Sequence, residues 1–79
     1  MSEQLIPARK TIMFLLKVLR NELVNSDATQ LHKCIAFLEI SNYIKGFCYG
    51  NLEISSNEYK LVTGYLDRLS DRYKLDMLH

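Results

Sequence analysis

The sequence contains little glycine, proline or cysteine and no tryptophan: three glycines, one proline and two cysteines among 79 residues. So few glycines and prolines exclude a collagen-like or low-complexity chain. Two cysteines can form one bridge at most, which argues against a secreted disulfide scaffold. We therefore expect both to be reduced thiols in a cytosolic protein.

Charge of one sign and long apolar runs are also lacking. The net charge of +1 shows none of the basic excess that is typical of a dedicated nucleic-acid binder. Arg9 and Lys10 precede an apolar run at residues 12–16, but Lys17 interrupts it and no small-residue cleavage site follows, which argues against a signal peptide. No stretch approaches the ~20 apolar residues of a membrane span. We expect a cytoplasmic protein with no membrane partner.

The motifs of catalysis and metal binding are missing as well. His32 and Cys34 are two positions apart and would point in different directions on a helix, while Cys48 completes no familiar zinc spacing. The sequence has no nucleophile elbow, no phosphate-binding glycine loop and no zinc-protease motif. We predict that the protein is not an enzyme and holds neither metal nor cofactor.

What the sequence does have is apolar residues, 48% of the total, at helical spacing. The pattern predicts an all-α fold: a small three-helix bundle, made of an antiparallel helical hairpin and a third helix, in one domain over residues 1–79. A chain of this length buries only roughly 60% of its unfolded surface. Because such small cores often need support, we expect a homodimer.

The first helix is predicted from about Pro7 to Val24, because proline is well tolerated in a first helical turn. Its apolar residues recur every three or four positions and predict one core-facing stripe. The stripe comprises Ala8, Ile12, Leu15, Leu16, Leu19 and Leu23.

The second helix is predicted from about Ala28 to Gly46 or Tyr49, with Asp27 and Gln30 as a capping box. Two apolar stripes follow it, and one neighbouring helix cannot cover both, so we expect it to be enclosed in the bundle or shared with another subunit. The stripes are Leu31, Cys34, Ile35 and Leu38 on one side and Phe37, Ile40, Ile44 and Phe47 on the other.

Residues 47–54 allow two predictions. Gly50 can end the second helix, since glycine tolerates the positive φ of many helix ends. Alternatively, Gly50 and Asn51 can close a tiny hairpin, which would leave a short extended stretch near residues 47–54. We favour the helix end, because so short a hairpin is barely stable.

The third helix has the clearest start signal, a capping box of Ser55 and Glu58. Heptad-like spacing then predicts an inward face of Tyr59, Val62, Leu66, Leu69 and Tyr73. Gly64 lies within this helix, where it suggests a close approach of another helix.

A candidate binding surface lies on the first helix, outside its core stripe. Phe14 and Val18 form a second apolar strip, flanked by Lys10 and Lys17, and an apolar centre with a charged rim is typical of protein interfaces. The alternative is that neighbouring elements, such as residues 47–54, cover the strip. The second stripe of helix two supplies the other candidate interface residues: Phe37, Ile40, Ile44 and Phe47.

These features predict a small non-enzymatic regulatory or inhibitory protein that binds a protein partner through an apolar helical surface. Bacterial accessory regulators and phage-encoded inhibitors include chains of this size and composition, which is an analogy only. The alternative is a small DNA-binding transcriptional regulator that uses basic residues of helix one, such as Arg9 and Arg20, or of the end of helix three.

Overall fold

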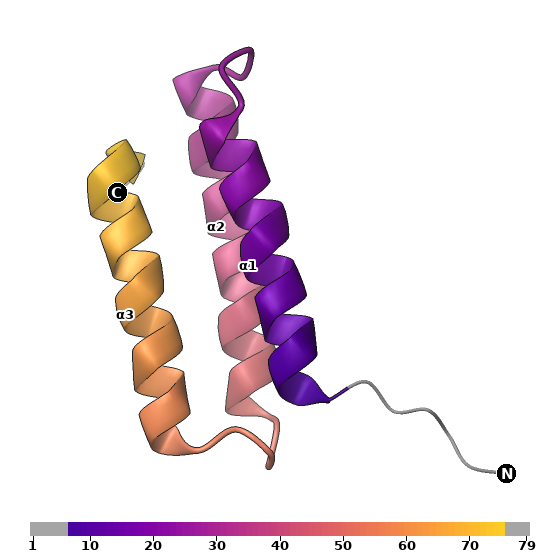
Figure 1. Ribbon diagram of the computed structural model, residues 1–79. Helices are drawn as coiled ribbons and strands as arrows, with labels where there is room; N and C mark the ends of the chain where they lie inside the picture. Colours follow the sequence, from indigo (N-terminus) through magenta and orange to yellow (C-terminus); the bar gives the residue numbers. More distant parts are fainter. Residues whose placement is uncertain (1–6, 76–79) are drawn as a thin grey trace, which may run out of the picture.

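A computed structural model describes residues 7–75, and this part of the chain forms a small all-α three-helix bundle without strands (Figure 1). The helices are α1 (Ala8–Val24), α2 (Gln30–Tyr49) and α3 (Ser56–Tyr73). The predicted fold class is confirmed. Helix α2 packs closely against both other helices, whereas the backbones of α1 and α3 lie farther apart. This unequal packing decides which surfaces of the bundle stay open.

Helices α1 and α2 form the predicted antiparallel hairpin (Figure 1). The predicted start of α2 was wrong, because the N-cap is Thr29, whose hydroxyl accepts a 3.0 Å hydrogen bond from the backbone N–H of His32. Asp27 instead lies in the turn, where its own N–H donates to Asn25 Oδ1. The amide of Gln30 donates to the carbonyls of Tyr73 and Lys74, at 2.8 and 3.1 Å, and ties the start of α2 to the end of α3.

The segment between α2 and α3 is a connection and contains no hairpin of strands. Helix α2 continues to Tyr49, and Gly50 is its C-cap, as the favoured prediction held. Gly50 has a φ of −92°, a value that any residue can adopt. The positive φ that was expected at this position is therefore absent. The Asn51 side chain then accepts a 2.8 Å hydrogen bond from the N–H of Glu53, which shapes the turn into α3.

The start of α3 is the predicted capping box. The Ser55 hydroxyl accepts from the N–H of Glu58 at 3.1 Å, and the Glu58 carboxylate accepts from the N–H of Ser55 at 3.0 Å. Two helix-end donors are therefore paired reciprocally. At its other end, α3 stops at Lys74, which has a left-handed φ of 56°.

The core lies along α2 and takes residues from all three helices. The predicted stripe of α1 is confirmed, since four of its members are buried and Leu15 and Leu16 pack partly buried beside them. On α3, Leu66 and Leu69 are buried, with Tyr59, Val62 and Tyr73 packed against the core. The largest fully buried side chains are Leu19, Leu23, Ile44, Leu66 and Cys34.

Candidate protein-binding surface

The second stripe of α2, which was expected either to be enclosed in the bundle or to form an interface, packs inside the subunit. Ile44 has no exposed surface, and Phe37, Ile40 and Phe47 are partly buried against the core. The expectation for Ile44 is therefore corrected, because it packs inside one chain. The buried residues of α2 come from both predicted stripes, since Cys34 belongs to one and Ile44 to the other.

The opposite stripe of α2 is the one that stays open. Leu31, Ile35 and Leu38 are 55%, 44% and 52% exposed, while Cys34, assigned to the same stripe, is buried. The three exposed side chains recur at spacings of four and three, so they lie along one side of the helix. We call these three residues the exposed α2 stripe.

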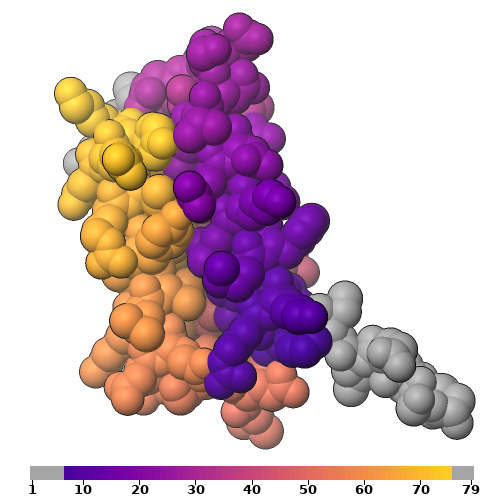
Figure 2. Space-filling view, viewed as in Figure 1, coloured from indigo at the N-terminus to yellow at the C-terminus, as the bar shows by residue number. Residues whose placement is uncertain are grey.

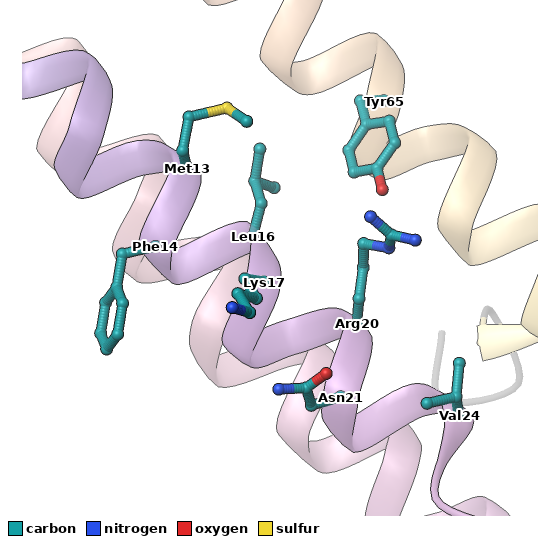
Figure 3. A pocket seen from close by; sticks show the side chains of 8 residues that line it. All are labelled: Met13, Phe14, Leu16, Lys17, Arg20, Asn21, Val24 and Tyr65. Carbon is teal, nitrogen blue, oxygen red and sulfur yellow. The ribbon is translucent and has the colours of Figure 1, made fainter.

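On α1, the predicted strip is exposed only in part. Phe14 is 64% exposed, but Val18 is partly buried. Lys10 and Lys17, which were expected to flank the strip, are both exposed. Figure 3 shows Phe14 directed away from α3, so it lies at the outer margin of the α1 surface.

The structure contains an open groove between α1 and α3 with a volume of about 800 Å³, which includes Phe14 and Lys17 of the predicted strip but was not itself predicted. The boundary between the two helices runs along the face seen in Figure 2. Met13 and Val24, neither of which was singled out from the sequence, are 65% and 61% exposed. The groove is lined by Met13, Phe14, Leu16, Lys17, Arg20, Asn21, Val24 and Tyr65.

Side-chain directions show which residues form the centre of this α1–α3 groove. Met13, Leu16 and Arg20 extend from α1 toward α3, and Tyr65 reaches back from α3 (Figure 3). Met13, Leu16, Arg20 and Val24 recur at spacings of three and four, so they form one line along α1. That spacing is the sequence signal that could have identified the groove.

Two polar contacts fix one end of the groove by joining α1 to the elements after α2. Arg9 forms an ion pair with Glu58 at the start of α3. The pKa of Glu58 is lowered to about 2, chiefly by the hydrogen bond from Arg9 and next by the bond from the Ser55 backbone. The N–H of Ala8 also donates to Glu53 Oε1 at 3.2 Å. The groove begins about one helical turn after these contacts, at Met13.

Charge in the groove is of one sign. Lys17 and Arg20 line it, and the Arg68 guanidinium lies 6.0 Å from the centre of the Tyr65 ring on the α3 side. No carboxylate lines the groove, and neither Lys17 nor Arg20 forms an ion pair within residues 7–75. The groove is thus an apolar surface that also carries cations, with Arg20 inside its line along α1 and Lys17 beside that line.

A second, smaller cavity of about 310 Å³ lies between α2 and α3. Ser41, Lys45 and Asp67 are among its polar lining residues, and the Ser41 hydroxyl already donates to the Leu38 carbonyl at 3.3 Å. Over residues 7–75, no three histidine, cysteine or acidic side chains lie close enough to hold a metal ion. The α1–α3 groove is larger and has exposed apolar residues on its wall, so it is the stronger candidate site.

Comparison with known proteins finds no matching family model, no matching curated protein and no matching solved structure. None of the helices in residues 7–75 has the length and apolar character that crossing a membrane requires.

Proposed function

We propose that this protein is a small non-enzymatic regulator or inhibitor, which acts by binding another protein through the α1–α3 groove. The observation that carries the proposal is the exposure of Met13 and Val24, each above 60%, on the wall of one groove. Single exposed apolar residues are common, but apolar residues gathered in a groove with a charged edge are typical of binding surfaces. Reduced thiols at Cys34 and Cys48 are in keeping with a cytoplasmic location.

The test is a quantitative pull-down from the source cell with three versions of the full chain. Met13→Glu puts a charge into the groove without removing a core side chain, because Met13 is mostly exposed. Leu52→Glu is the matched control, since Leu52 is fully exposed in the connection between α2 and α3. We expect a partner retained by the wild type and by Leu52→Glu to be lost from Met13→Glu. Equal recovery by all three versions would refute binding through the groove, provided that circular dichroism shows unchanged helicity.

Self-association is a second part of the proposal, and the exposed α2 stripe supports it. Leu31, Ile35 and Leu38 form an apolar line that stays about half exposed in residues 7–75. In a dimer with twofold symmetry, the same surface of each subunit can pack against its copy. Leu38→Glu should then shift a dimer to monomer in sedimentation equilibrium. A monomeric wild type at concentrations of about 100 μM would exclude a stable dimer.

A DNA-binding regulator is the alternative, favoured by Lys17 and Arg20 on α1, which form no ion pair with any residue between 7 and 75. Phosphate contacts would make binding fall steeply with salt, whereas an apolar protein contact would change little. The alternative leaves the exposed Met13 and Val24 without a role, because phosphate binding does not need apolar groove walls. We therefore rank protein binding first.

A further inference from the structure

The α1–α3 groove has the length of a short helical partner. Its line along α1, apolar except for Arg20, extends from Met13 to Val24, which at 1.5 Å per residue is about 16 Å, or three helical turns. Tyr65 stands opposite this line on α3 and supplies the second wall (Figure 3). An amphipathic helix laid along α1 could place apolar side chains at i, i+3 and i+7 against these residues.

The cations that line the groove specify the charge of such a partner. Lys17 and Arg20 have no ion pair within residues 7–75, and Arg68 lies beside Tyr65. Glu58, the acid at the fixed end of the groove, is already paired with Arg9. Carboxylates on the incoming helix would therefore meet unpaired cations, while basic side chains would be repelled.

We propose that the α1–α3 groove binds an amphipathic helix of another protein, whose apolar stripe is flanked by aspartate or glutamate. This inference rests on the proposed function and adds the chemistry of the partner. A second copy of this chain fits less well, because its own α1 surface carries Lys10, Lys17 and Arg20 and would bring like charges together. Nucleic acid would satisfy the cations but not the apolar wall.

The test uses two synthetic helices, each about 18 residues long and labelled with fluorescein, in anisotropy titrations with the full chain. Both carry the same leucine stripe, flanked by glutamates in one peptide and by lysines in the other. We expect the glutamate peptide to bind at least about tenfold more tightly than the lysine peptide. A labelled DNA duplex of random sequence is the third probe.

Two charge-reversal variants locate the binding. Arg20→Glu should weaken binding of the glutamate peptide by about fivefold, since one attractive contact becomes repulsive. Lys60→Glu makes the same change at an exposed position five residues before Tyr65, on another side of α3, and should leave the affinity within about twofold.

Three outcomes would overturn the inference: equal binding of both peptides, binding of neither, or Arg20-dependent binding of the duplex without binding of the glutamate peptide. Failure of this inference can be distinguished from failure of the proposed function. If Met13→Glu still abolishes capture of the natural partner while the glutamate peptide does not bind, the groove binds a protein of other chemistry. If Met13→Glu has no effect on that capture, the proposed function itself fails.

Discussion

The backbone N–H of Ala8 donates a 3.2 Å hydrogen bond to the carboxylate of Glu53, a residue 45 positions later in the chain. Helix α1 needs this contact because its own N-cap, Pro7, offers no side-chain acceptor and its first turn contains no acidic residue. An acceptor with a negative charge is stabilising at a helix N-terminus. The connection between α2 and α3 therefore caps α1 from outside.

The first prediction concerns this cap. Glu53→Ala should lower the free energy of unfolding by about 1 kcal/mol, as the loss of an N-cap acceptor does elsewhere. Glu53→Gln is the matched control, because it keeps an acceptor oxygen and loses only the charge. Its free energy of unfolding should lie between those of the wild type and Glu53→Ala. Urea unfolding followed by circular dichroism measures both. An alanine variant as stable as the wild type would show that the contact is not stabilising.

The second prediction concerns pH. The pKa of Glu58 falls from an ordinary value of 4.5 to about 2 in the folded protein, chiefly through Arg9. A lowered folded-state pKa means that the stabilisation is complete above pH 4.5, declines as the pH falls toward 2 and is absent below it. The stability difference between the wild type and Glu58→Gln should therefore be largest at neutral pH and vanish near pH 2.

Urea unfolding at several pH values tests the Glu58 prediction. Removing Arg9 is the control: in an Arg9→Gln background, the pH-dependent difference should shrink, because the chief cause of the lowered pKa of Glu58 is gone. A difference between wild type and Glu58→Gln that stays constant from neutral to acidic pH would contradict the prediction.

The third prediction separates two adjacent candidates for the cap of α2. Thr29→Ala should cost about 1 kcal/mol of stability, because it removes the acceptor for the N–H of His32. Asp27→Ala should change stability by less than about 0.5 kcal/mol, since the Asp27 side chain is exposed in the turn and caps no helix. Chemical denaturation of the two variants side by side gives the answer. The reverse order would restore Asp27 as the cap.

The start of a helix could be predicted from the sequence where only one residue nearby was a good N-cap. Ser55 and Glu58 have the spacing of a capping box and no nearby competitor, and the structure contains that box. At the start of α2, Asp27 and Thr29 are both good caps by residue type. Thr29 is the cap in a structure where the next residue, Gln30, donates hydrogen bonds to the end of α3. A contact with a segment so far along the chain cannot be read from the local sequence.

The open surfaces were harder to predict for two physical reasons. The buried face of α2 runs through Cys34, Ser41, Ile44 and Cys48, and because it includes a serine, the apolar pattern pointed to the flanks on either side. The α1–α3 groove lies between two helices that pack far more closely on α2 than on each other. Helical periodicity identifies the faces of a helix, but it does not tell which pairs of helices stay apart.

The last prediction concerns Gly64, which was expected to allow another helix to come close. A Cβ atom built there meets only the side chain of Arg68, at 3.7 Å, an ordinary van der Waals distance. Its backbone is helical without a positive φ, so alanine fits without strain, and Gly64→Ala should stabilise the protein by up to about 1 kcal/mol. Thermal and urea unfolding measure the gain, with Gly46→Ala on α2, where a Cβ meets nothing within 4 Å, as the matched comparison. Destabilisation by Gly64→Ala alone would mean that another helix, from this chain or a partner, does approach α3 at this point.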